Sequence, residues 1–184
     1  MAKLRIAVVV GSLRKESFNR KLAEGLAKLG AAELDFHFVR IDDLPLYNQD
    51  LEREPHPAVQ RLKQEIRDSQ GVLFVTPEYN RSLPGVLKNA IDHASRPYGE
   101  SAWAGKPAGL CGISVGALGT GVAQLHLRSI LGYLDMPTLG APEVYVQVKD
   151  GMFAPDGSIG IEATRKFLKG FLESYTAWVK RFAE

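Results

Sequence analysis

Short apolar segments alternate with amphipathic segments along almost the whole chain, and this alternation constrains the fold more than any other feature. Strands buried on both faces read as short β-branched or otherwise apolar runs that stop at glycine or polar residues. Such runs occupy residues 4–10, 34–41, 71–76, 107–114 and, with a weaker apolar pattern, 142–148. Apolar residues at three- and four-residue spacing predict helices over residues 17–29, 58–69, 84–93, 120–134 and 162–182.

Strands that alternate with helices predict a parallel sheet covered by helices on both faces. Parallel neighbours need a long crossover, and a helical crossover covers the face of the sheet over which it passes. The pattern therefore indicates an α/β three-layer sandwich. No internal repeat or linker interrupts it, and 184 residues is an ordinary length for one domain. We expect residues 1–184 to form a single domain that binds its ligand beyond the carboxyl ends of the strands.

Composition and charge exclude several classes of protein. Hydrophobic residues make up 45% of the chain and charged residues 24%, which argues against a disordered or fibrous protein. The net charge of +2 comes without a basic cluster, so we expect no nucleic-acid partner. The single cysteine, Cys111, excludes an internal disulfide, and four scattered histidines predict no metal site. No apolar run approaches the roughly 18 residues of a membrane span, so we expect a cytoplasmic protein without a membrane partner.

The loop after the first strand, residues 11–19, combines short polar side chains with the start of a helix. Gly11 allows a tight exit from the strand, while Ser12, Ser17 and Asn19 offer donors beside the free N–H groups of the helix. Arg14 adds a cation, so the set suits a terminal phosphate. An ordinary turn with a serine cap explains the same residues. Neither GxGxxG nor GxxxxGK[ST] occurs in this loop.

The loop after the third strand, residues 76–85, is polar and bounded by Pro77 and Pro84. Proline restricts the backbone at both ends, so the residues between can be held in one shape. A rigid polar loop that carries Tyr79 suits the edge and face of a flat heteroaromatic ring. A surface loop followed by a capped helix is the alternative.

These two loops together carry a family resemblance. GSLRKESFN at residues 11–19 and PEYNRSLPGVLKNAID at residues 77–92 resemble the NADPH-dependent FMN reductase family of flavodoxin-like proteins. That family includes bacterial quinone, azo-dye and chromate reductases. The resemblance extends to residues 44–48 and 114–120, and it implies a flavodoxin-like sandwich with strand order 2-1-3-4-5.

The resemblance implies a non-covalently bound FMN and an NAD(P)H-dependent reaction, with NADPH as the donor. A hydride would pass from the nicotinamide to flavin N5, and electrons would then pass to quinones, free flavin, azo dyes or metal ions. No catalytic side chain is expected, because the cofactor carries the chemistry. By the same resemblance, the phosphate would be bound by Ser12, Arg14, Ser17 and Asn19. The ring and ribityl chain would be bound by Pro77, Glu78, Tyr79, Asn80, Ser82, Ser114 and Gly116.

Two other functions remain open at this stage. A flavodoxin-type electron carrier would share the fold and FMN, but such carriers are generally acidic, whereas the isoelectric point of this chain is about 8.6. Residues 112–116 also match GxSxG, the nucleophile elbow of serine hydrolases. The expected order of serine, acid and histidine is missing, because His126 is the only downstream histidine and precedes any later aspartate.

The segment 122–134 is apolar around more of its circumference than a helix covering one sheet face requires. A subunit interface explains this, and the family resemblance implies a homodimer or a homotetramer. A helix crowded by the C-terminal helix is the alternative.

Overall fold

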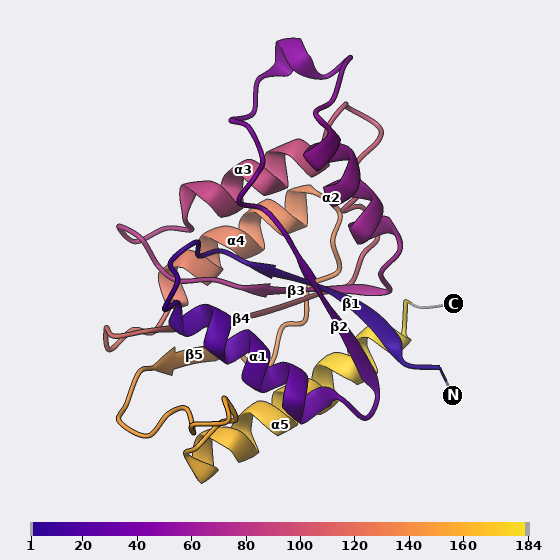
Figure 1. Ribbon diagram of the computed structural model, residues 1–184. Helices are drawn as coiled ribbons and strands as arrows, with labels where there is room; N and C mark the ends of the chain where they lie inside the picture. Colours follow the sequence, from indigo (N-terminus) through magenta and orange to yellow (C-terminus); the bar gives the residue numbers. More distant parts are fainter. Residues whose placement is uncertain (1, 183–184) are drawn as a thin grey trace.

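The computed structural model describes residues 2–182 and shows the expected alternation as regular elements (Figure 1). The strands are β1 (Leu4–Val10), β2 (Leu34–Val39), β3 (Gly71–Val75), β4 (Ala108–Ser114) and β5 (Val144–Gln147). The helices are α1 (Phe18–Gly30), η1 (Gln49–Leu51, a 3₁₀ turn), α2 (Pro57–Arg67), α3 (Gly85–Ala94), α4 (Gly121–Tyr133) and α5 (Glu162–Lys180). The expected boundaries are wrong by one or two residues at most ends; for example, β2 ends at Val39 rather than at residue 41.

The strands form one parallel sheet in the order β2-β1-β3-β4-β5, which confirms the flavodoxin-like topology. Helices α1 and α5 cover one face, and α2, α3 and α4 cover the other (Figure 1). Strand order reverses at β1, because the chain moves to β2 on one side and to β3 on the other. The carboxyl ends of β1 and β3 therefore form the switch point where such sheets bind ligands. No helix within residues 2–182 has the length and apolarity to cross a membrane.

The burial of β1 explains why its residues 6–10 are all apolar. Ile6 and Val8 pack in the cluster beneath α1 and α5, while Ala7 and Val9 pack in the cluster beneath α2, α3 and α4. All four side chains are fully buried, so neither face of this part of the strand admits polar residues.

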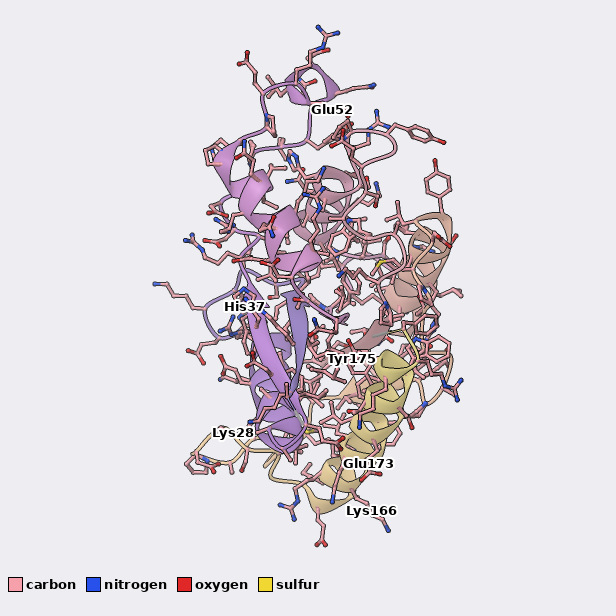
Figure 2. All side chains as sticks on the ribbon, turned by 90° about the vertical axis from the view of Figure 1, so that its right-hand side faces the viewer. Lys28, His37, Glu52, Lys166, Glu173 and Tyr175 are labelled. Carbon is pink, nitrogen blue, oxygen red and sulfur yellow. The ribbon has the colours of Figure 1, made fainter. Side chains whose placement is uncertain are left out.

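Helix α5 shows the one-sided pattern instead. Tyr175 is fully buried in the first core cluster, whereas Lys166 and Glu173 are exposed on the outer side of the helix (Figure 2). One apolar stripe is enough for this helix, because it covers a single face of the sheet.

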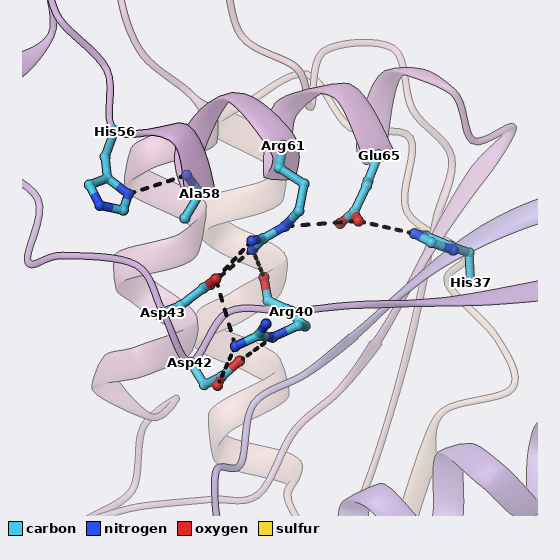
Figure 3. Close-up of polar contacts among 8 residues, drawn as sticks. All are labelled: His37, Arg40, Asp42, Asp43, His56, Ala58, Arg61 and Glu65. Atoms are coloured by element: carbon cyan, nitrogen blue, oxygen red, sulfur yellow. Dashed lines mark hydrogen bonds and ion pairs between the residues drawn. The ribbon is translucent and has the colours of Figure 1, made fainter.

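The segment between β2 and α2 extends away from the sheet, with Glu52 near its far end (Figure 2). Its first part is fixed to α2 by Arg61, whose Nη1 and Nη2 donate to the two carboxylate oxygens of Asp43 at 2.7 and 2.9 Å (Figure 3). Nη2 also donates to the carbonyl oxygen of Arg40 at 3.1 Å. The two hydrogen bonds that Arg61 donates to Asp43 lower the pKa of its carboxyl group to about 2.

Asp43→Asn is expected to lower the free energy of unfolding by about 1 kcal/mol at neutral pH, a value reduced for partial exposure of the pair. The folded-state pKa lies below the unfolded value of about 3.9, so the contribution is present above that value. It is lost as the pH falls through the folded-state pKa near 2. Urea unfolding of both proteins at neutral pH and near pH 3 measures the effect. A stability difference that stays constant between these conditions would contradict this account.

Candidate functional site

The loops after β1, β3 and β4, which we call the first, third and fourth loops after the strand that each follows, meet at one edge of the sheet because small residues let their backbones approach closely. The N–H of Gly11 donates to the carbonyl of Val75 at 2.9 Å, which joins the ends of β1 and β3. A Cβ on Gly112 would lie 2.2 Å from the Thr76 carbonyl oxygen and 2.2 Å from Thr120 Oγ1. The loop after β1 thus meets the end of β3, and the end of β4 lies against residues of the loops after β3 and β4.

The first loop leads into an N-terminus of α1 that keeps free donors. Ser17 Oγ accepts from the N–H of Arg20 at 3.2 Å, which confirms Ser17 as the helix cap. Among the contacts of residues 2–182, no acceptor is found for the N–H groups of Phe18 and Asn19. The Arg14 side chain lies over the Phe18 ring, with its guanidinium carbon 5.8 Å from the ring centroid. Free N–H groups and a cation together suit a dianion.

Asn19 has a second partner that the sequence did not reveal. Its Nδ2 donates to the carbonyl of Ile113 at 2.9 Å, and its Oδ1 accepts from the N–H of Ile113 at 3.0 Å. The side-chain amide is buried and joins α1 to β4. Asn19 therefore offers its backbone N–H, rather than its side chain, to a ligand of the first loop.

The third loop ends in a tight hairpin. Tyr79 and Ser82 exchange two backbone hydrogen bonds of 3.0 Å, and Asn80 and Arg81 between them have φ values of 51° and 64°. Two successive positive φ angles are typical of a type I′ turn. The Tyr79 side chain is half exposed, and Ser82 Oγ lies 3.0 Å from His126 Nδ1 on α4. No local sequence pattern had predicted His126 at this site.

Two further residues of the predicted site lie at the root of the third loop. Pro77 is buried, and its carbonyl oxygen accepts from Thr76 Oγ1 at 2.8 Å. Glu78 turns its carboxylate toward α4, where Oε2 accepts from the N–H groups of Val122 and Ala123 at 3.0 and 3.1 Å. Any contact of Glu78 with a ligand of this loop would therefore come from its backbone.

Ser114 organises the fourth loop through its hydroxyl group. Its Oγ donates to the carbonyl of Gly119 at 2.5 Å and accepts from the N–H of Gly116 at 3.2 Å. Gly119 has a φ of 57°, and a Cβ there would lie 2.8 Å from the carbonyl carbon of Tyr145. The hydroxyl group of Ser114 is thus hydrogen-bonded to backbone groups of its own loop. A hydrolytic nucleophile would instead be hydrogen-bonded to a general base.

Two hollows among the described residues bear on the placement of the site, and the smaller of them borders the third loop. One of about 510 Å³ is lined by Ser82 and His126 together with residues of α3 and α4. The larger, of about 750 Å³, lies between residues 45–57, α2 and the end of α3, and none of the predicted cofactor residues line it. We place the candidate site at the three loops, because they hold the free donors and the close backbone approaches.

Comparisons with known proteins concern the chain as a whole and identify its family. The family model described as NADPH-dependent FMN reductase matches residues 4–150. The chain is 51% identical to a 2-hydroxy-1,4-benzoquinone reductase of Burkholderia sp, over 96% of this chain and 97% of that protein. It is also 51% identical to a quinone reductase of Pseudomonas putida, over 95% and 94% of the two chains.

Among solved structures, the chain is similar to FerB, a flavoenzyme NAD(P)H:(acceptor) oxidoreductase of Paracoccus denitrificans. The TM-score is 0.94 at 46% identity, and the match covers 97% of this chain and 98% of that one. These findings confirm the oxidoreductase class, and FMN with NAD(P)H as its cofactors, against the electron carrier and the serine hydrolase. With a family model matching most of its length and relatives at 51% identity, the chain belongs to the NADPH-dependent FMN reductase family.

Proposed function

We propose that this chain is an NADPH-dependent quinone reductase whose FMN phosphate lies at the N-terminus of α1. The observation that carries the placement is the free N–H groups of Phe18 and Asn19 beside the Arg14 guanidinium. The helix dipole and a charged donor both favour a dianion at this position. The Ser12 and Ser17 hydroxyls complete the proposed phosphate site.

The ring of FMN is proposed to lie between the third and fourth loops. Bound FMN supplies the two-electron chemistry, so the chain has only to bind and orient it. Backbone groups of Pro77, Glu78 and Asn80, with Tyr79 and Ser82, would hold one side of the ring. The Ser114–Gly119 loop would contact the other side, where Gly116 allows close approach of the backbone.

Quinones are the proposed acceptors, because the two curated relatives described above are named for quinone reduction. Free flavin, azo dyes and metal ions remain acceptors to be tested alongside them. The anionic donor NADPH needs a cation near the site. Arg81, with its side chain 68% exposed at the hairpin tip, offers one beside the ring loop.

The visible spectrum of the purified protein before and after anaerobic NADPH tests this function. We expect a yellow protein that NADPH bleaches, and whose colour returns when a quinone is added. A colourless protein that binds no added FMN would overturn the proposal. A flavoprotein that NADPH reduces only through a separate reductase would favour the electron carrier.

We also propose that residues 1–184 form one cytoplasmic domain that assembles as a homodimer or homotetramer. The support for the assembly lies on α4, where Leu125 and Tyr133 are 63% and 83% exposed. Both are large and apolar in character, and they lie on the helix that borders the 510 Å³ hollow. A subunit that covered them would remove this surface from water. Sedimentation equilibrium tests the assembly, and a monomer at all concentrations would contradict it.

Ser114→Ala separates a flavin-loop hydroxyl from a hydrolytic nucleophile. Ser114 Oγ makes two neutral hydrogen bonds within its own loop. Each costs about 0.5–1.5 kcal/mol to lose, whereas loss of a triad nucleophile costs about 10⁶-fold in turnover. We expect the variant to fold, to bind FMN and to keep quinone reduction within about tenfold of the parent, with no ester hydrolysis by either protein. Esterase turnover in the parent that vanishes in the variant would reverse this conclusion.

A further inference from the structure

Helix α4 begins without a cap from its own sequence. Thr120 stands at the N-cap position but makes no side-chain capping bond, and its Oγ1 instead accepts from Gln124 Nε2 at 2.8 Å. The N–H groups of Val122 and Ala123 are bound by Glu78 Oε2, from a residue more than forty positions earlier. The third loop therefore caps the helix that follows the fourth loop.

The Glu78 carboxylate is mostly buried, and nearby N–H groups and a guanidinium group balance its charge. Its side chain is only 10% exposed, and Oε1 lies 3.6 Å from Arg81 Nη1. A carboxylate that accepts two N–H groups at a helix N-terminus gains from both the hydrogen bonds and the helix dipole. These contacts hold a long, flexible side chain in one position.

Glu78 lies next to the hairpin of the third loop, so its contact with α4 also affects the position of that hairpin. Its neighbour Tyr79 begins the hairpin closed by the two backbone bonds to Ser82. On the other side, Ser114 holds the fourth loop to Gly119, two residues before α4 begins. One carboxylate thus links the hairpin of the third loop to the helix that ends the fourth loop.

We propose that Glu78 is a positioning residue that fixes these two loops relative to each other and so preforms the cleft for the flavin ring. This inference rests on the proposed function, which places the ring between the same loops. Glu78 acts here through its carboxylate on the protein, and its side chain makes no contact with the ring. The simpler alternative is a helix cap that contributes to stability alone.

Riboflavin separates the two accounts, because it carries the ring without the phosphate. If Glu78 shapes the ring cleft, Glu78→Ala should weaken the binding of FMN and of riboflavin by the same factor, about tenfold or more, because two charge-assisted hydrogen bonds that hold the cleft are lost. Glu78→Gln should lie between the parent and Glu78→Ala, since its amide oxygen still accepts. Fluorescence titration of the apo-protein with each flavin measures both dissociation constants.

Glu52→Ala is a matched control in a different loop. The Glu52 carboxylate also accepts two bonds, from Tyr47 Oη at 2.6 Å and Arg96 Nε at 2.7 Å, and its side chain is 17% exposed. Glu52 holds the loop between β2 and α2, which is not part of the proposed ring cleft. The dissociation constant of riboflavin should therefore stay at the parent value. Circular dichroism checks that each variant folds, and Glu78→Gln carries the test if Glu78→Ala does not.

Amide exchange of the apo-protein gives a readout that does not depend on flavin. Exchange at Val122 and Ala123 should be faster in Glu78→Ala than in the parent. Faster exchange with unchanged riboflavin binding would show that Glu78 only caps the helix, and would overturn the inference. Unchanged exchange at Val122 and Ala123 would also overturn it, because the cap itself would then make no difference. A parent that binds neither flavin would instead overturn the proposed function, so the two failures are distinguishable.

Discussion

Arg14→Ala is expected to raise the dissociation constant of FMN about ten- to more than hundredfold. A hydrogen bond to a charged group contributes about 1.5–3 kcal/mol, which corresponds to this range. The guanidinium lies over the Phe18 ring at the start of α1, beside the free N–H groups of the proposed phosphate site. Equilibrium titration of the apo-protein with FMN measures the change.

Two comparisons make this test specific. Lys15 is exposed and next in sequence, so Lys15→Ala should change FMN binding much less than Arg14→Ala. Riboflavin lacks the phosphate, so its dissociation constant should be the same for Arg14→Ala and the parent. Equal effects of the two substitutions on FMN would mean that diffuse positive charge, and not a placed guanidinium, holds the phosphate. Riboflavin that binds the parent as tightly as FMN would exclude a phosphate anchor.

Gly112→Ala is expected to lower the free energy of unfolding by about 3 kcal/mol or more, because the new methyl group has no space. Its Cβ would lie 2.2 Å from both the Thr76 carbonyl oxygen and Thr120 Oγ1. The first atom belongs to the backbone and the second to a fully buried side chain, so neither moves without displacing a loop of the site. Urea unfolding measures the loss, and FMN titration of any folded protein measures the displacement.

Gly132→Ala is the matched control for this substitution. Gly132 lies in α4, and a Cβ there would meet no atom within 4 Å. Alanine also favours a helix over glycine by about 1 kcal/mol, so the stability of Gly132→Ala should equal or exceed that of the parent. If Gly112→Ala were as stable as Gly132→Ala, the loops would be less tightly joined than the structure shows.

The sheet could be predicted from the sequence because its cause is local and repeated. Strands such as β1 are buried on both faces, and the resulting apolar run is visible without knowledge of any partner. The ends of the elements depend on single contacts instead. Residue 41 is buried and apolar like a strand residue, yet β2 has already ended at Val39.

The candidate site was predictable in its loops and less so in its side chains. The resemblance predicted three loops that the structure brings to one edge of the sheet, but the partners of Asn19 and Glu78 are 94 and 44 or 45 residues away in the chain. Contacts of that separation leave no mark on the local pattern of either segment. His126 was missed for the same reason, because only the packing of α4 brings it to Ser82.

The burial of Cys111 also protects the chain from covalent modification by quinones. Quinones are electrophiles that arylate exposed thiolates, and this chain has one cysteine in total. Cys111 lies within β4 with no solvent exposure, and burial raises the pKa of its thiol. A protonated thiol in the middle of a sheet is neither nucleophilic nor accessible. The fold thereby removes its one soft nucleophile from the compounds that the proposed activity brings to its surface.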